Sequence, residues 1–119
     1  YLNALTLHHH GYARLGGVGA LSRRWSFSAS QMRIDDGVDG SGRHCVSRRL
    51  HTTLAVERTA DGALFTGREA RFRIRADGPV TIEPATFWGA YGRGGPATAI
   101  DVTIAARLPW QGVLTVEVE

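Results

Sequence analysis

The segment from residue 22 to residue 51 constrains the fold most, because apolar and polar side chains alternate along it in three successive runs. A period of two is typical of β-strands that bury one face and expose the other. Between the second and third runs, residues 35–42 are rich in Asp and Gly, which tolerate the backbone angles of tight turns. The segment therefore predicts an antiparallel meander of three strands. Its predicted core residues are Trp25, Phe27, Met32, Ile34, Val46 and Leu50.

The same alternation recurs along the rest of the chain, with turn residues between the runs. Asp61-Gly62 predicts a hairpin between residues 53–58 and 63–65, and Asp77-Gly78-Pro79 predicts a second hairpin between residues 70–75 and 80–82. Residues 84–96 contain many glycines and aromatic residues and are expected to form a long loop. We count about ten short strands and no amphipathic helix. The sequence therefore predicts one all-β domain over residues 1–119, an antiparallel β-sandwich.

Length and composition limit the classes of protein to which the chain can belong. Its 119 residues suffice for one self-supporting core, and no apolar run is long enough to span a bilayer. The single Cys45 cannot form an intramolecular disulfide and is expected to be a buried structural thiol. The chain starts at Tyr1 and has a strand pattern from residue 2, which suggests a piece of a longer protein. Neither a membrane segment nor a signal peptide is predicted.

The basic residues are all arginine, and the net charge is +3. Nucleic acid is not an expected partner, because the arginines are scattered and no helix-turn-helix, RNP or zinc-finger pattern accompanies them. Arg71, Arg73 and Arg75 would lie on one sheet face about 7 Å apart, a spacing that suits an anionic polysaccharide. The alternative is a set of hydrated or salt-bridged arginines on the wet face of a sheet.

Two further groups of residues are candidates for binding. Trp88, Tyr91 and Arg93 could present a flat apolar surface and a guanidinium to a sugar, or the aromatic rings could close one end of the sandwich. His8 and His10 would lie on the same side of a strand and could supply two ligands to a metal. A solvated strand end is the alternative for the histidines. No catalytic motif is present, so no catalytic residue and no cofactor are predicted.

Several short motifs occur in an order that resembles a known family. The motifs are His10-Gly11-Tyr12-Ala13-Arg14-Leu15, Ser22-Arg23-Arg24, Met32-Arg33-Ile34-Asp35-Asp36, Gly40-Ser41-Gly42-Arg43-His44, Arg49-Leu50-His51, Ala90-Tyr91-Gly92 and Arg107-Leu108-Pro109. In this order they resemble the C-terminal β-rich domain of the heparinase II/III-like family. The match spans nearly the whole chain, although each motif is short.

The resemblance implies a bacterial polysaccharide lyase in which an (α/α) toroid precedes an antiparallel β-sandwich and an anionic glycan lies between them. It implies β-elimination next to a uronate whose carboxylate is neutralised. The family's catalytic residues match no position here, so this chain is expected to be inactive alone and to serve as a scaffold or a wall of the cleft. We expect a periplasmic location, although composition leaves the compartment open.

Two alternatives remain at this point. An independent carbohydrate-binding module would use Trp88, Tyr91 and the arginines to bind an anionic glycan without a toroid. A structural domain without a ligand would be favoured by homodimerisation through an edge strand at residues 2–7, because the unpaired backbone groups of an edge strand invite another chain.

Overall fold

The computed structural model describes residues 3–119 and confirms an all-β fold with ten strands. Within the described residues, no helix is long and apolar enough to cross a membrane. The strands, in chain order, are β1 (Asn3–His9), β2 (Val18–Phe27), β3 (Gln31–Gly40), β4 (Arg43–Thr52), β5 (Ala55–Thr59), β6 (Gly62–Thr66), β7 (Arg71–Ala76), β8 (Val80–Ala90), β9 (Arg93–Arg107) and β10 (Trp110–Val118).

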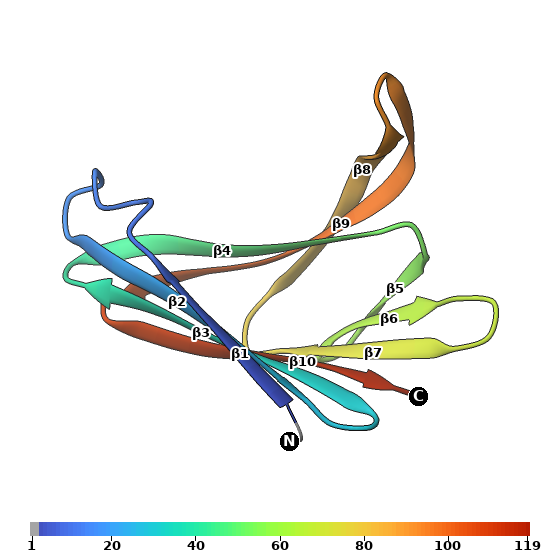
Figure 1. The fold of residues 1–119 in the computed structure, drawn as a ribbon, viewed down its shortest axis with the longest axis horizontal. Coiled ribbons are helices and arrows are strands. Elements are labelled where there is room, and N and C mark those ends of the chain that lie inside the picture. The colour runs from blue at the N-terminus through green and yellow to red at the C-terminus, as the bar shows by residue number, and fades with distance from the viewer. Residues whose placement is uncertain (1–2) are drawn as a thin grey trace.

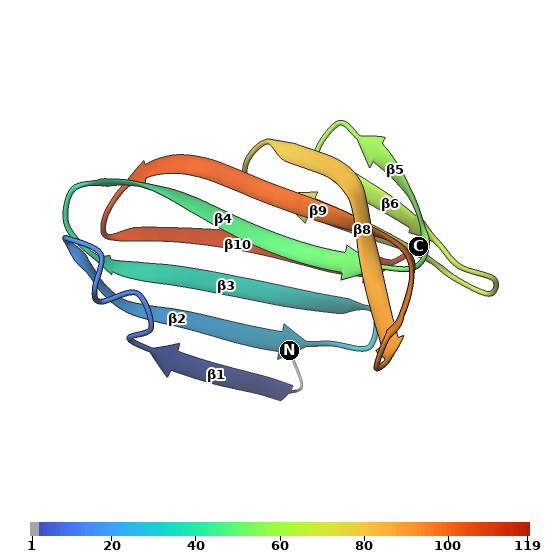
Figure 2. The same cartoon turned by 90° about the horizontal axis from the view of Figure 1, so that it is seen from above.

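The strands form two antiparallel sheets that face each other. The large sheet has seven strands in the order β1-β2-β3-β10-β7-β6-β5, and the small sheet has three in the order β4-β9-β8. Figures 1 and 2 show the small sheet lying over the large one, with β1 at one side. Every described residue of β1 is exposed, so the small sheet leaves this edge of the large sheet uncovered.

The core lies between the two sheets and consists mainly of aliphatic residues from both. The fully buried large side chains are Ile34, Ile74, Ile100, Leu114 and Val102. Trp25, Met32 and Leu50 are half-buried and pack against this core, as the sequence predicts, whereas Val46 is half-buried outside it. Burying a side chain of this size stabilises the fold by about 1.5–3 kcal/mol, so the apolar faces of the strands hold the two sheets together.

Two predicted hairpins are wrong, because a strand pattern does not say which sheet a strand joins. β2 pairs with β3, but β4 pairs with β9 in the small sheet, so residues 22–51 are not a single meander. β7 likewise pairs with β6 and β10, while β8 belongs to the other sheet. The hairpin between β5 and β6 is confirmed.

The turn that carries the chain from β3 to β4 depends on glycine. Gly40 and Gly42 have φ angles of 134° and 82°, a region that L side chains rarely adopt. A Cβ atom at Gly40 would lie 1.9 Å from the carbonyl oxygen of Gly17. The change of sheet at this turn therefore rests on backbone conformations and on a close approach that other residues do not permit.

Three other local predictions are corrected by the structure. Phe27 is 39% exposed rather than buried, because it lies at the end of β2, near the uncovered edge of the large sheet. Cys45 is exposed, because it alternates with the half-buried Val46 and points to the outer face of β4. Residues 84–96 are not a loop, since they form most of the β8–β9 hairpin. Aromatic residues favour strands, and Gly92, with a φ angle of 72°, makes the reversal tight.

Candidate functional site

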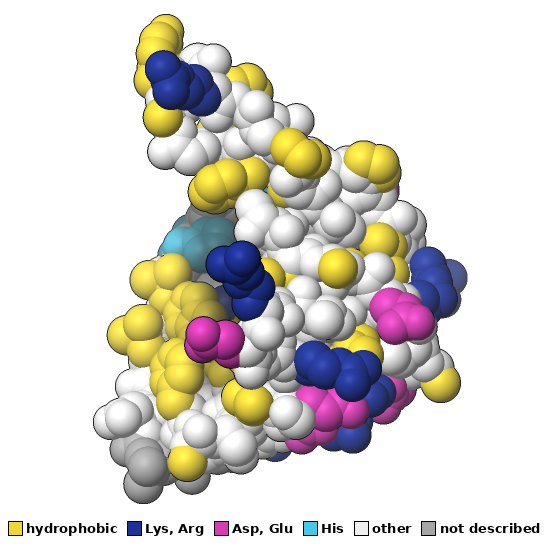
Figure 3. Space-filling view, turned by 90° about the vertical axis from the view of Figure 1, so that its right-hand side faces the viewer, with side chains coloured by type: hydrophobic (Ala, Val, Ile, Leu, Met, Phe, Trp, Pro, Cys, Tyr) yellow, Lys and Arg dark blue, Asp and Glu magenta, His cyan; other side chains and the backbone are white. Residues whose placement is uncertain are grey.

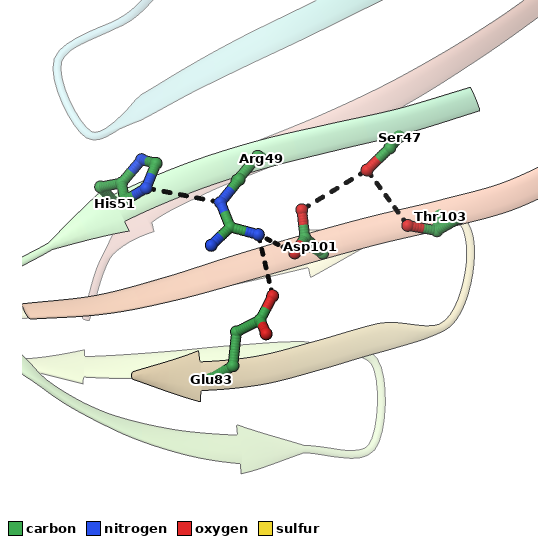
Figure 4. Close-up of polar contacts among 6 residues, drawn as sticks. All are labelled: Ser47, Arg49, His51, Glu83, Asp101 and Thr103. Carbon is green, nitrogen blue, oxygen red and sulfur yellow. Dashed lines mark hydrogen bonds and ion pairs between the residues drawn. The ribbon is translucent and has the colours of Figure 1, made fainter. Parts of the chain in front are cut away.

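The outer face of the small sheet carries a cluster of polar side chains, which Figure 4 shows from β4, β8 and β9. The β4–β9 register places Ser47 opposite Thr103 and Arg49 opposite Asp101, while Glu83 comes from β8. Side chains two residues apart on a strand point to the same face, so these residues share one surface. The Thr103 hydroxyl donates to Ser47 Oγ at 3.2 Å, and Ser47 Oγ donates to Asp101 Oδ1 at 3.4 Å.

Arg49 is the centre of this cluster. Its Nη1 atom lies 2.6 Å from Asp101 Oδ2 and 2.8 Å from Glu83 Oε1, so one guanidinium holds two carboxylates from neighbouring strands. Its Nε atom donates to His51 Nε2 at 3.4 Å. Because an arginine can only donate, His51 Nε2 is the acceptor of this hydrogen bond. The cluster thus presents hydroxyl groups and an oriented imidazole on an open sheet face.

The β8–β9 hairpin places aromatic rings beyond the body of the sandwich. Figure 3 shows this hairpin standing away from the rest of the molecule, with hydrophobic side chains on it. Trp88 is 65% exposed and Tyr91 is fully exposed, whereas large aromatic side chains are usually buried. A Cβ atom at Gly94, which is opposite Trp88, would come within 3.1 Å of the indole. The absence of a side chain at Gly94 therefore lets the ring lie against the backbone of β9.

A hollow of about 500 Å³ lies at the base of the hairpin, next to the polar cluster. Pairing between β4 and β9 ends at Thr52 and Thr98, and the hairpin continues past this point. The hollow is lined by aromatic rings, threonines and one histidine, namely Phe87, Trp88, Thr52, Thr53, Thr86 and His51. Aromatic faces beside hydroxyl and imidazole groups can hold the apolar face of a sugar and bond its hydroxyls.

The predicted site residues lie in three separate places. Trp88, Tyr91 and Arg93 come together at the hairpin, where Arg93 is opposite Ala90 in the register of the turn. The aromatic rings do not close the end of the sandwich, because both are exposed. The hairpin is part of the small sheet, whereas the three predicted arginines of β7 belong to the large sheet.

The arginines of β7 lie on the outer face of the large sheet beside acidic residues. Arg73 bonds Glu119 at 2.8 Å, and Arg75 pairs with Asp61 at 3.2 Å and with Glu117. The hydrogen bond to Glu119 raises the pKa of Arg73, and the same bond lowers the pKa of Glu119. Arg71 is exposed. Two of the three cations are therefore already paired with neighbouring carboxylates.

The two predicted metal ligands lie at the end of β1. His8 is in the strand, but β1 ends at His9, so His10 lies in the turn that follows. His9 instead accepts a hydrogen bond from the Gly11 backbone at 3.1 Å. Within residues 3–119, the structure contains no group of three or more His, Cys, Asp or Glu residues that could hold a metal ion.

One charged residue inside the sandwich was not predicted. Arg48 is 4% exposed, pairs with Asp77, and has its guanidinium carbon 4.9 Å from the centre of the Trp110 ring. Its Nε and Nη1 atoms are buried without a hydrogen-bond partner among the described residues. The sequence contained a signal for this burial. Arg48 lies between Val46 and Leu50 in the alternation of β4 and therefore shares their inward-facing side.

Comparisons with known proteins identify the fold. No family model matches this chain, and no curated protein matches its sequence. Among solved structures, a heparinase III is similar with a TM-score of 0.79 and 13% sequence identity. The similarity covers 98% of this chain but only 19% of the heparinase III chain. The chain therefore has the fold of a heparinase-like β-sandwich and corresponds to about a fifth of that protein's length.

Proposed function

We propose that this chain is the C-terminal β-sandwich domain of a polysaccharide lyase and forms one wall of the cleft that holds a uronate-containing glycan. The observation that carries the proposal is the structural similarity to heparinase III over 98% of the chain. The order of the sequence motifs, from residues 10–15 to residues 107–109, supports the same family independently of the fold. The rest of the lyase would be an (α/α) toroid of the same polypeptide.

The division of roles follows from the chemistry that the chain presents. β-Elimination needs a base for the proton next to the carboxylate, an acid for the leaving oxygen, and a group that neutralises the carboxylate. On the outer face of the small sheet, Arg49 already holds Asp101 and Glu83, so this cluster is suited to binding rather than to proton transfer. The sandwich would position the glycan, and the toroid would supply the reacting groups.

A second candidate function, an independent carbohydrate-binding module, is favoured by the exposed rings of Trp88 and Tyr91. The two functions differ in what the chain does without the rest of the lyase. A module binds oligosaccharides with its full affinity alone, whereas a cleft wall binds them measurably alone and more tightly once the toroid completes the site. The third possibility is a homodimer through β1, for which the apparent molecular mass in size-exclusion chromatography would rise with protein concentration.

The test is an activity assay on the isolated chain and on a fusion protein. We expect no unsaturated uronate product, measured by ultraviolet absorbance, from heparin, heparan sulfate or alginate. Release of such a product by the chain alone would contradict the proposed division of roles. Fusion to the toroid of a heparinase III, in place of its own sandwich, is expected to restore lyase activity, and an inactive but folded fusion would count against the lyase assignment.

The hairpin is tested with Trp88→Ala, which removes an exposed ring. We expect glycan affinity of the fusion protein to fall by about tenfold, corresponding to a stacking contribution of about 1–1.5 kcal/mol. The matched control is Phe27→Ala, because Phe27 is also an exposed aromatic but lies on β2. Equal losses in the two variants would show that the hairpin has no special part in binding.

A further inference from the structure

Two arginines stand directly opposite each other at the end of the small sheet that is farther from the hairpin. Arg43 is the first residue of β4, Arg107 is the last residue of β9, and the register pairs them. Both are exposed, and both share the outer face with Ser47, Arg49 and Thr103, because the spacing along each strand is even. The next pair on this face, at residues 45 and 105, is a cysteine and an alanine. These small side chains leave the surface beside the two guanidinium groups open.

This pair differs from the other arginines of the two sheets. Arg49, Arg73 and Arg75 each have a carboxylate partner. Neither Arg43 nor Arg107 has an ion pair or a hydrogen bond to any side chain that the structure describes in residues 3–119. Arg24, which also has no ion pair within the described part of the chain, lies opposite Thr6 and Asp35. Arg68 lies in the loop between β6 and β7, so neither of these residues has a second arginine opposite it. The pair is therefore a local concentration of positive charge that the protein itself does not neutralise.

Like charges at directly opposite positions of an antiparallel pair destabilise the sheet, because their Cβ atoms are only about 4.5–5.5 Å apart. A single anion between the two guanidinium groups would remove this repulsion and accept charge-assisted hydrogen bonds from both. Guanidinium groups are planar forks that suit anions with two or more oxygens. The arrangement thus fits a sulfate or a carboxylate group better than a neutral hydroxyl.

We propose that Arg43 and Arg107 form an oxyanion clamp that binds a sulfate or carboxylate group of a glycan. Arg43 and His51 are eight steps apart on β4, which corresponds to about 26 Å of strand at about 3.3 Å per residue. The clamp and the hollow at the hairpin therefore suit an oligosaccharide that runs along the outer face, with the polar cluster of Arg49 between its ends (Figure 4). The clamp deepens the proposed function and rests on it only for the claim that a glycan carries the anion.

The test uses the 119-residue chain and the double variant R43Q/R107Q. The matched control is R24Q/R68Q, which removes the same charge from two exposed arginines that do not face each other. Binding of heparin oligosaccharides, alginate oligosaccharides and neutral dextran oligosaccharides is measured by calorimetry, and the effect of inorganic sulfate on the melting temperature is measured separately. We expect R43Q/R107Q to lose about tenfold in affinity for an anionic oligosaccharide, and the control to lose less than about threefold.

The two oligosaccharides separate the two possible anions. A loss for heparin alone identifies sulfate as the bound group, and a comparable loss for alginate identifies carboxylate. In low salt without sulfate, R43Q/R107Q is expected to melt at the same temperature as the parent chain or higher, because the repulsion is gone. Added sulfate is expected to raise the melting temperature of the parent chain more than that of the variant. A purely structural role for the arginines would instead lower the melting temperature of the variant.

The outcomes distinguish failure of the clamp from failure of the proposed function. Equal losses in R43Q/R107Q and R24Q/R68Q would overturn the clamp, because net charge alone would then explain binding. Unchanged glycan affinity in R43Q/R107Q would also overturn the clamp and leave the proposed function intact. Stabilisation by sulfate that depends on the two arginines, without binding of any glycan, would support an anion site and refute the link to a polysaccharide.

Discussion

Removing Asp77 is expected to destabilise the sandwich more than removing its partner Arg48. Asp77 is the ion-pair partner of the buried Arg48, and its Oδ2 atom accepts a hydrogen bond from the Val113 backbone at 2.6 Å. In Asp77→Ala, the Arg48 guanidinium keeps its charge between the sheets without a counter-ion. In Arg48→Met, the carboxylate of Asp77 is left behind, but its side chain is 35% exposed and water can solvate it.

The magnitudes follow from this difference in burial. Breaking a buried ion pair by removing one partner costs about 3–5 kcal/mol, because an uncompensated charge remains in a medium of low polarity. Because Asp77 is partly exposed, we expect the loss of unfolding free energy in Asp77→Ala to lie near the lower end of this range, at about 3 kcal/mol. Arg48→Met loses a cation–π contact with Trp110 but removes two buried donors that lack partners, and a thioether packs well against an indole. We expect its loss to be about 1 kcal/mol or less.

The assay is urea unfolding, followed by tryptophan fluorescence and circular dichroism, of the parent chain, both single variants and the double variant. The double variant is expected to be more stable than Asp77→Ala, because the charge that Asp77 neutralised is gone. Asp77→Asn separates the charge from the hydrogen bond to Val113. A loss below about 1 kcal/mol for Asp77→Ala, or an equal loss for Arg48→Met, would refute the reasoning that burial of the guanidinium makes the pair asymmetric.

Two further predictions concern the β3–β4 turn and the pH dependence of stability. Gly40→Ala is expected to lower the free energy of unfolding by more than about 3 kcal/mol, because its φ angle is unfavourable and its Cβ would lie against the Gly17 carbonyl. Gly92→Ala also has an unfavourable φ angle but has open space, and is expected to lower it by about 1 kcal/mol. Equal losses of the two variants in urea unfolding would contradict the clash. The hydrogen bond from Arg73 lowers the pKa of Glu119. The contribution of this bond to stability is therefore present above the carboxyl's ordinary pKa and is lost as the pH falls through the lowered pKa. The melting temperature of Glu119→Gln should therefore change less than that of the parent chain over this acidic range, and parallel curves would refute the pairing.

The alternation of side chains predicted the class of fold and most of the strands, because a period of two is a local property of extended backbone. It placed Ile34 in the core and Trp88, Tyr91 and Arg93 together, since these three are close in the chain. It could not place β4, because the pattern of a half-buried strand is the same in either sheet. The aromatic and glycine content of the β8–β9 hairpin was read as a loop, although its residues pair over most of their length.

The tertiary structure decided which charges meet. The arginines of β7 appeared free in sequence, but Glu117 and Glu119 of the C-terminal segment pair with two of them after β10 joins β7. Arg43 and Arg107 are 64 positions apart and become neighbours only because β4 pairs with β9. Sequence by itself determined which segments form extended strands and which face of each strand is apolar. The pairing of distant strands determined the charge pattern of the surface, because charges interact through space and not along the chain.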